Sequence, residues 1–351
     1  MKLFSRRNTI LGVVIVVVSL LSATIGALVV GSSLDQYIAS LDSIGRNVVA
    51  INSVKPHAFP GSAQEALAGA KEKAEYSSLP IVNIKDRVHR DGVVVSRSIG
   101  TATALTTDGW VLMPDSVMSV YGKNAKIVLG GEVHDISEFV QDPASEYGFA
   151  KTTISDARVG TFGSSVSAAQ GDYVFVISGE VVYPRTISNE NNYDNELSVA
   201  SGDVLSRSFL LDQAVDVPVG AMVTNAVGEL IGLMIDGDTV RPLHHMTPAL
   251  ETVLLDGEVN RAKIGMQVRD VMRIVDVDEE FREGWRVVSL DRRGAAEKSG
   301  LLIDDVIMRI QGQNVGAMPL AEYVATGKVD GQIQLHVQRE ETEIEIFVTL
   351  E

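Results

Sequence analysis

The sequence predicts a mainly β protein preceded by one N-terminal transmembrane helix. A long uncharged apolar segment predicts the helix, and short β-rich runs separated by turn residues predict the β fold of the remaining chain. Hydrophobic residues make up 45% of the chain and charged residues 22%, which is the balance of a folded globular protein. A chain of 351 residues is long enough for about two domains.

Charge and cysteine content exclude several classes of function. The chain has 30 Lys and Arg residues against 46 Asp and Glu residues, which gives a formal net charge of −16. A nucleic-acid partner is not expected, because binding nucleic acid needs a basic face that neutralises phosphates. The absence of cysteine excludes disulfides, thiolate zinc sites and a cysteine nucleophile. No cofactor is expected.

The N-terminal 33 residues have the pattern of a signal anchor. Lys2, Arg6 and Arg7 precede an uncharged run, and its stretch Thr9–Val30 is as long as the roughly 20 apolar residues that span a bilayer. Residues 1–33 are therefore expected to form a cytoplasmic stub and a single inner-membrane helix. The positive-inside rule then places the bulk of the chain in the periplasm or another extracytoplasmic space. Cleavage of the segment as a signal peptide is the alternative.

Residues 34–77 are predicted to form a helical stalk or linker. Apolar residues recur at alternating spacings of 3 and 4 from Leu34 to Ile51, which is a heptad pattern. Such a pattern can join neighbouring chains, but fewer than three heptads favour an amphipathic helix that lies on its own domain. Pro56, Pro60 and Gly61 end the pattern, and a second helix is expected over Ser62–Tyr76.

Residues 78–255 have the pattern of a β-barrel or β-sandwich domain, because short strands follow one another without intervening helices. The pair Asp108-Gly109 predicts a hairpin turn between two of the strands. A helix over Thr247–Leu255 closes the region. The predicted strands are Pro80–Ile84, Gly92–Ser96, Thr101–Leu105, Trp110–Met113, Ala125–Leu129 and Tyr173–Ile177.

A polar linker, residues 256–263, leads to a smaller mixed domain over residues 264–351. Two short helices are expected among its strands, near Ala295–Ser299 and Pro319–Thr326. The predicted strands are Met266–Val271, Trp285–Leu290, Val306–Ile310, Gln332–Gln338 and Glu343–Leu350.

Several segments resemble, in order, the HtrA/DegP family from about residue 79 to residue 351. Leu79–Ile84 is similar to the family's opening PSVVNI strand, and Gly228–Gly232 is similar to its GEVIGI strand. The other matching segments are Gly100–Val117 (GTATALTTDGWVLMPDSV), Asp142–Ala150 (DPASEYGFA), Gln170–Gly179 (QGDYVFVISG) and Gly294–Leu301 (GAAEKSGL). The resemblance implies a chymotrypsin-like double β-barrel over residues 78–255 and a PDZ domain over residues 264–351.

The same alignment predicts that the chain is not an enzyme. The family's catalytic histidine corresponds to Ser116, its aspartate to Glu146 and its nucleophilic serine to Pro218. Acyl transfer needs a hydroxyl nucleophile, an imidazole base and a carboxylate that orients the base, and these positions retain only the carboxylate. Proline also lacks the N–H that would contribute to an oxyanion hole. No Ser, Thr or Cys occurs from Phe209 to Val223, so a shifted alignment restores no nucleophile.

The predicted PDZ domain keeps the features of a peptide-binding site. Residues 263–268 resemble the carboxylate-binding loop, whose backbone N–H groups bind the C-terminus of a peptide that adds a strand to the sheet. Leu320 and Val324 lie one helical turn apart and line the apolar side of the groove, or else are ordinary core. The predicted peptide-binding residues are Lys263, Ile264, Gly265, Met266, Gln267, Val268, Leu320 and Val324.

No metal site is expected. His244 and His245 are adjacent, so their side chains are expected to point to different sides with no carboxylate facing them. The oxygen-rich segment Asn189–Glu196 has ligands for Ca²⁺, but a solvated acidic loop is the favoured interpretation.

These features favour a membrane-anchored, extracytoplasmic HtrA-like pseudoprotease that binds peptides or protein C-termini as a scaffold or chaperone-like module. The resemblance also implies a homotrimer or a mixed assembly with active HtrA relatives. Two alternatives stay open. One is an active HtrA-type serine endopeptidase of envelope protein quality control with a displaced nucleophile, and the other is a structural envelope component whose groove is closed.

Overall fold

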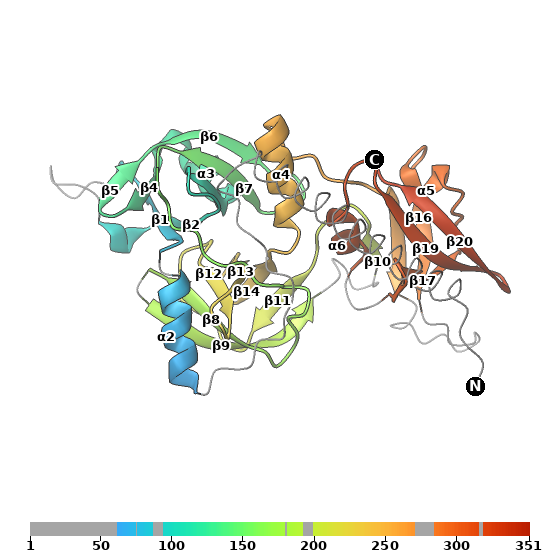
Figure 1. Cartoon of the computed structure of the whole chain (residues 1–351), viewed down its shortest axis with the longest axis horizontal. Helices are drawn as coiled ribbons and strands as arrows, with labels where there is room; N and C mark the ends of the chain where they lie inside the picture. The colour runs from blue at the N-terminus through green and yellow to red at the C-terminus, as the bar shows by residue number, and fades with distance from the viewer. Residues whose placement is uncertain are drawn as a thin grey trace, which may run out of the picture. The chain divides into compact units, whose positions relative to one another are not determined.

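The computed structural model describes residues 62–74, 76–86, 94–179, 181–191, 199–270, 284–315 and 319–351. These residues form two β regions and a third, C-terminal sheet (Figure 1). The predicted membrane segment and the heptad segment Leu34–Ile51 lie outside the described residues. Within the described ranges, no helix is long and apolar enough to cross a membrane.

The first β region is a seven-stranded antiparallel sheet with the strand order β5-β4-β1-β2-β3-β7-β6. The predicted Asp-Gly turn joins β2 to β3: Gly109 has a φ of +96°, and a Cβ there would lie 2.5 Å from the Ile154 carbonyl oxygen. The elements are β1 (Ser78–Asn83), β2 (Gly100–Ala104), β3 (Trp110–Pro114), α3 (Asp115–Tyr121), β4 (Ala125–Leu129), β5 (Glu132–His134), β6 (Ile136–Gln141) and β7 (Tyr147–Thr152).

One predicted strand of this region is wrong. Of the predicted strand Gly92–Ser96, residues 92 and 93 lie outside the described chain, and Val95–Arg97 form a 3₁₀ helix (η2) that buries no residue. Val94 and Val95 are 38% and 45% exposed, so their apolar side chains do not pack into the sheet that the pattern predicted.

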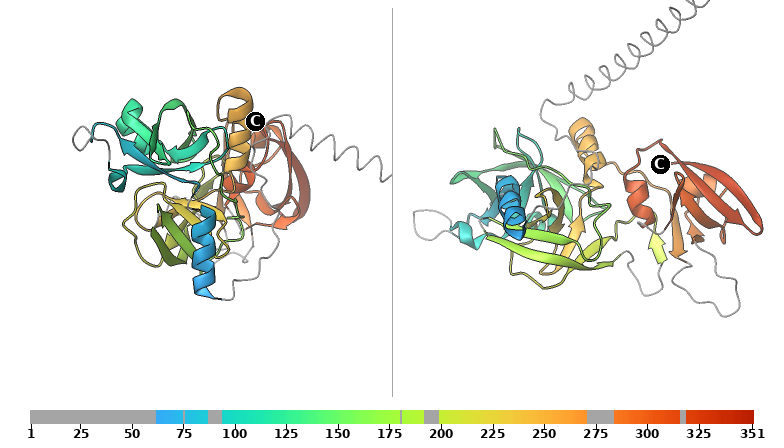
Figure 2. Two further views of the ribbon diagram at one scale, coloured as in Figure 1. Left: turned by 60° about the vertical axis from the view of Figure 1, so that its left-hand side comes forward. Right: turned by 60° about the horizontal axis from the view of Figure 1, so that its bottom comes forward.

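The second β region is a closed barrel with the order β11-β14-β13-β12-β8-β9. The predicted helix over Ser62–Tyr76 is confirmed as α2 (Ala63–Ala74), which lies against β8, β9 and β12 (Figure 2). Ala66 and Ala70, one turn apart on α2, are buried in the barrel core. The remaining elements are β8 (Tyr173–Ser178), β9 (Val181–Asn191), β11 (Ser208–Leu211), β12 (Met222–Asn225), β13 (Leu230–Met234), β14 (Thr239–Pro242) and α4 (Met246–Asp256).

The C-terminal sheet has the order β10-β15-β16-β17-β19-β20, with the short β18 paired to β17. Its first strand, β10 (Val199–Ser201), comes from the excursion between β9 and β11 of the barrel, and the sequence pattern does not predict it. The other elements are β15 (Met266–Asp270), β16 (Trp285–Leu290), α5 (Ala295–Lys298), β17 (Val306–Ile310), β18 (Gln313–Asn314), α6 (Leu320–Ala325), β19 (Gln332–Arg339) and β20 (Thr342–Thr349).

A buried ion pair ties the linker before the C-terminal sheet to the first β region. The Arg261 guanidinium donates to both oxygens of Asp142, with an Nη2–Oδ2 distance of 2.6 Å, and the Asp142 side chain is 0% exposed. Burial alone would raise the pKa of Asp142, but the hydrogen bonds and charge of Arg261 bring that pKa below its ordinary value.

Arg261→Met is expected to lower the free energy of unfolding at pH 7 by about 3–5 kcal/mol, because it leaves a buried carboxylate without its cation. Guanidinium titrations measure this change. Lys298→Met, which removes the exposed ion pair with Glu351, is the control and should change stability by less than about 0.5 kcal/mol.

Wild type and Arg261→Met should also differ in how their stability depends on pH in the acid range. A carboxyl with a lowered pKa stabilises the fold above its unfolded value and loses this contribution as pH falls through the folded pKa. Without Arg261, protonation relieves the buried charge instead, so the stability gap between wild type and Arg261→Met should begin to narrow above about pH 4, as the variant's carboxyl takes up a proton, and narrow further below it, as the wild type loses its ion pair. A gap that stays constant or widens in acid would contradict this account of the pair.

Candidate functional site

The three positions that correspond to a serine-protease triad lie in adjoining loops. Ser116 is in the first turn of α3, Glu146 immediately precedes β7, and Pro218 lies in the loop before β12. The Asp115 N–H donates to the Glu146 carbonyl over 2.9 Å. A Cβ at Gly220 would lie 2.8 Å from the Pro114 ring, so the loop that carries Pro218 packs against the start of α3.

The carboxylate of Glu146 is bound by a guanidinium. Arg241 on β14 donates from Nε to one oxygen of Glu146 over 2.8 Å and from Nη2 to the other oxygen. Arg241 also donates from Nη1 to the Arg207 carbonyl over 2.7 Å, which fixes its position. A bidentate arginine uses the oxygens that would otherwise orient an imidazole. Sequence reasoning did not find Arg241, because it lies 95 positions after Glu146.

Backbone contacts and apolar packing hold the loop around Pro218. Gly220 has a φ of +86°, and its N–H donates to the Met234 carbonyl over 2.8 Å. The Val219 carbonyl accepts the Thr101 N–H over 2.8 Å. Val217 and Val219 pack against two separate hydrophobic clusters. The loop is therefore fixed without a hydroxyl, and position 218 has no N–H to offer an oxyanion.

The predicted peptide-binding loop holds a carboxylate from the same chain. The Asp203 carboxylate accepts the Ile264 N–H over 2.7 Å and the Gly265 N–H over 3.1 Å. Immediately before it, β10 pairs antiparallel with β15, Ser201 opposite Gln267 and Ala200 opposite Val268, and the Gly202 N–H donates to the Met266 carbonyl over 2.9 Å. Residues 199–203 thus occupy the groove that the sequence assigns to a peptide.

Helix α6 forms the apolar wall of this groove. Leu320 and Val324 are buried in one hydrophobic cluster with Ala200 and Ile264, and α6 contacts β10. A Cβ at Gly202 would lie 2.3 Å from Ile264 Cγ2 and 3.1 Å from Leu320 Cδ2, so the occupying segment passes here without a side chain. Leu320 and Val324 therefore belong to the hydrophobic core and also line the groove.

The charges around the loop leave Asp203 imperfectly compensated. Burial raises the pKa of Asp203 above its ordinary value despite the two backbone hydrogen bonds, and the nearby Asp291 carboxylate raises it further. Lys263, whose backbone N–H donates to the Glu351 carbonyl over 2.7 Å, acts in the opposite direction through its charge. A cavity of about 400 Å³ adjoins the loop, and Gly202, Asp203, Lys263 and Asp291 are among its lining residues.

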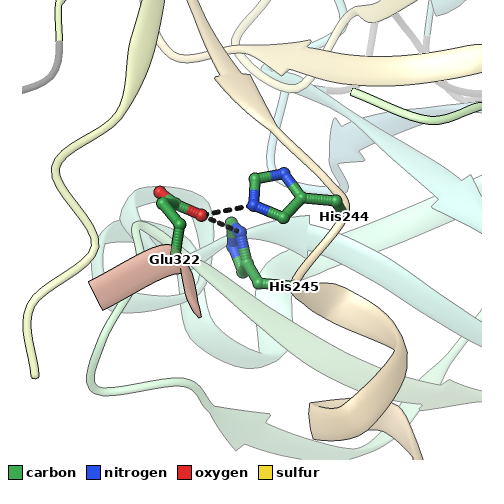
Figure 3. A group of neighbouring side chains, drawn as sticks. All are labelled: His244, His245 and Glu322. Atoms are coloured by element: carbon green, nitrogen blue, oxygen red, sulfur yellow. Dashed lines mark ion pairs between the residues drawn. The ribbon is translucent and has the colours of Figure 1, made fainter. Parts of the chain in front are cut away.

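A second cluster of titratable groups lies on the other side of α6. Figure 3 shows the Glu322 carboxylate pointing at the imidazoles of His244 and His245, which precede α4. Its Oε2 is 2.6 Å from His244 Nε2 and 3.5 Å from His245 Nδ1. The expectation that no carboxylate faces the two histidines is wrong, because Glu322, 77 positions beyond His245 in the sequence, folds against them.

Burial sets the protonation of this cluster. It lowers the pKa of His245 to about 4, although Glu322 favours the charged imidazole. Burial alone would raise the pKa of Glu322, but the close contacts and charges of the two histidines bring that pKa well below its ordinary value. Each of these three residues has a nitrogen or oxygen atom that could bind a metal, and these three atoms lie within 4.8 Å of one another.

Ser165 extends the cluster into a serine–histidine–carboxylate chain. Its Oγ lies 2.9 Å from His244 Nδ1 and accepts the His244 backbone N–H over 3.0 Å. These are the residue types of an acyl-transfer triad. Ser165 is 0% exposed, however, so its hydroxyl does not reach a polypeptide carbonyl in this conformation.

No family model matches this chain. The probable periplasmic serine endoprotease DegP-like of Rickettsia conorii is 22% identical over 211 residues, which cover 56% of this chain and 40% of that protein. Serine endoprotease DegS of Haemophilus influenzae is 19% identical over 80% of this chain and 87% of its own length. The chain spans 40% and 57% of the lengths of the DegP-like proteins of Rickettsia conorii and Marinomonas.

Among solved structures, HtrA-type protease AlgW with a tripeptide matches with a TM-score of 0.57 and 19% identity, over 81% of this chain and 96% of that one. AlgW with a decapeptide matches with a TM-score of 0.53. The chain is therefore mainly β and has the trypsin-like double-barrel fold of the HtrA/DegP serine proteases.

Restoring two triad residues, Ser116→His with Pro218→Ser, is expected to leave casein cleavage at least about 1,000-fold slower than that of an active HtrA protease. Arg241 holds the Glu146 carboxylate, and Val217 and Val219 pack the loop against two hydrophobic clusters. The turn at Pro218 closes with the Ala221 N–H donating to the Pro218 carbonyl, so this N–H is not offered to an oxyanion. A thermal melt shows whether the double variant is folded. Cleavage within tenfold of the active protease would show that the loop still forms an oxyanion hole.

Proposed function

We propose that this chain is a membrane-anchored, extracytoplasmic HtrA-like pseudoprotease that binds the C-termini of peptides or proteins through a PDZ-like C-terminal domain, as a scaffold or chaperone-like module. The observation that carries the proposal is the geometry at Asp203. Two consecutive N–H groups, from Ile264 and Gly265, bind a carboxylate while the preceding residues add a strand to β15. Recognition of a peptide C-terminus by strand addition uses the same two contacts.

The site composition supports a binding role over a catalytic one. Ser116, Glu146 and Pro218 offer no base and no nucleophile, and Arg241 binds the remaining carboxylate. The protease names of the relatives belong to those proteins, which match at 19–23% identity. Solved AlgW structures with a tripeptide and a decapeptide support peptide binding as the activity that this fold serves here.

The location rests on two observations. The apolar segment Thr9–Val30 follows three basic residues, and DegP-like relatives are named as periplasmic proteins. Assembly as a homotrimer, or with active HtrA relatives, belongs to the same proposal and is read directly from the mass of the purified protein in light scattering.

A specific arrangement favours one second candidate, an HtrA-type serine endopeptidase with a displaced nucleophile. Ser165, His244 and Glu322 supply hydroxyl, imidazole and carboxylate in that order, with 2.9 Å between Ser165 Oγ and His244 Nδ1 and 2.6 Å between His244 Nε2 and Glu322 Oε2. A fluorophosphonate probe separates the two functions, since it labels only an activated and accessible serine. Labelling of the wild type that disappears in Ser165→Ala would replace the pseudoprotease proposal with this one.

Peptide libraries with free and amidated C-termini test the binding proposal on the full chain. Free-acid peptides are expected to bind at least about tenfold more tightly than their amides, because hydrogen bonds to a charged group each contribute about 1.5–3 kcal/mol. Equal binding of both forms would remove C-terminal recognition from the proposal.

Gly265→Val is expected to weaken binding of free-acid peptides by at least about tenfold. Gly265 has a φ of +67°, and a Cβ there would lie 3.2 Å from the Asp291 side chain, so the loop must distort. Gly171→Val is the matched control: its φ is +95° and its Cβ meets nothing within 4 Å, so it shares the backbone strain but not the loop. Equal loss in both variants would assign the effect to general destabilisation.

A further inference from the structure

We propose that residues 199–203 are a built-in, replaceable ligand of the groove, which a free C-terminus must displace in order to bind. This inference rests on the proposed function, because the internal segment would compete with every external peptide that binds the groove. The segment Val-Ala-Ser-Gly-Asp makes the strand contacts and the carboxylate contact of a bound peptide, although Asp203 is an internal residue.

The two ends of the excursion are fixed on the barrel. Asn191 at the end of β9 pairs with Ser208 at the start of β11, so the two ends of the excursion lie at one place on the barrel. A tethered ligand of this kind acts at an effective concentration of the order of millimolar. An external peptide at micromolar concentration must therefore bind the groove about a thousandfold more tightly than the segment does.

The segment is a weak ligand by its composition. Its inward-facing residues are Ala200 and Gly202, so it places a single methyl group against Leu320 and Val324. A peptide with a large apolar side chain at either position would bury more apolar surface and bind more tightly, once Ile264 and Leu320 shift to admit it. Asp203 is also a poor carboxylate for the loop, because it lies beside Asp291 and burial favours its neutral form.

The partner that fits is accordingly a free C-terminus with an apolar last residue. Such a ligand presents its carboxylate from the main chain, whereas Asp203 reaches the loop through its side chain. Main-chain presentation leaves the terminal side chain free to enter the apolar space that Gly202 now passes. The groove would thus exchange a small internal ligand for a larger external one.

Two variants test the exchange with a fluorescent free-acid peptide that ends in Val-Val-Phe. Asp203→Ala removes the internal carboxylate and should tighten binding to the full chain by at least about tenfold, the equivalent of 1.4 kcal/mol. Asp86→Asn changes an exposed acid in the turn after β1. It is the control for the lost negative charge and should leave the affinity within twofold.

A disulfide gives the opposite change. Ser201 and Gln267 are directly opposed across β10 and β15, in the closely spaced pair that suits a cross-strand disulfide, and the chain has no other cysteine. The oxidised double variant Ser201→Cys/Gln267→Cys should show no binding at a peptide concentration ten times the wild-type Kd. Reduction of the disulfide should restore wild-type binding.

The outcomes separate the two proposals. Equal affinity of wild type and Asp203→Ala, or undiminished binding to the oxidised protein, would overturn the built-in ligand while leaving the groove a peptide site. No free-acid binding to any variant, with all of them folded, would overturn the proposed function itself.

A second inference comes from the cluster in Figure 3, and it is independent of the groove. We infer that His244, His245 and Glu322 form a site for a zinc-like divalent cation. Five of their nitrogen and oxygen atoms are buried and make no hydrogen bond of normal geometry: His244 Nε2, both ring nitrogens of His245 and both oxygens of Glu322. A buried polar atom without a hydrogen bond destabilises the fold, and one cation would bind three of these atoms at once.

The ligand chemistry and the surroundings agree with this inference. Two imidazoles and one carboxylate are a donor set that zinc takes in proteins. The other ring nitrogen of His244 lies 2.9 Å from Ser165 Oγ, a hydrogen bond of the kind that orients metal-binding imidazoles. Ligands of one tetrahedral zinc are roughly 3.3 Å apart, so His244 Nε2 and Glu322 Oε2 need to separate by less than 1 Å from their 2.6 Å contact.

Metal content after dialysis of the full chain against ZnCl₂ tests the site. Wild type should retain about one zinc per chain, and Glu322→Gln should lose at least tenfold in affinity. His336→Asn is the matched control, because His336 lies 3.6 Å from Glu345 in a partly exposed pair and should leave zinc content unchanged. Cobalt absorption of the wild type is the second readout, since intense tetrahedral bands do not depend on any variant folding. Zinc below a tenth of an equivalent, or cobalt bands like those of the free ion, would overturn the inference.

Discussion

The edge of β15 opposite β16 is the constraint on which the C-terminal sheet depends, because without β10 it would be unpaired. An unpaired strand edge exposes main-chain N–H and C=O groups, and the adjoining loop directs two further N–H groups at one point. Buried or half-buried donors of this kind require acceptors. Residues 199–203 supply both a strand and a carboxylate, so one short segment satisfies the edge and the loop together. The cost is a carboxylate placed beside Asp291, and for that reason the contact is one that a better ligand can replace.

The trypsin-like fold persists at the triad positions because their loops are held by groups other than the triad. The Asp115 N–H and the Glu146 carbonyl join two of the loops, and the Thr101 N–H and Val219 carbonyl join the third to β2. Arg241 then gives the Glu146 carboxylate a charged partner, which an acid without a histidine otherwise lacks. None of these contacts involves a nucleophile or a base. The three loops therefore keep their positions with serine at 116 and proline at 218.

Local patterns predicted much of the fold, but not the segment that lies in the predicted groove. Period-2 runs and turn residues gave β3, β4, β8 and most strands of the C-terminal sheet, and Ala/Glu/Lys content gave α2. The strand Val199–Ser201 was missed because three residues carry no periodicity and because its partner, β15, begins 65 positions after β10 ends. Glu322 was missed for the same reason. Its contact with His244 exists only after two distant segments pack together, and no spacing in the sequence encodes that packing.

Helix α6 is the element in which the two sites meet. Leu320 and Val324 face the groove and its occupant, while Glu322, between them in sequence, faces His244 and His245 from the opposite side of the same turn. A helix of six residues, Leu320–Ala325, has too few internal hydrogen bonds to hold its own position, so side-chain contacts on its two faces fix it. Enlarging the groove for a bulky ligand requires Leu320 to move, and any rotation of α6 that accommodates this also moves Glu322 relative to the imidazoles. A change that strengthens the contacts of Glu322 with the histidines must therefore oppose widening of the groove. By linkage, a ligand that widens the groove must weaken those contacts by the same free energy.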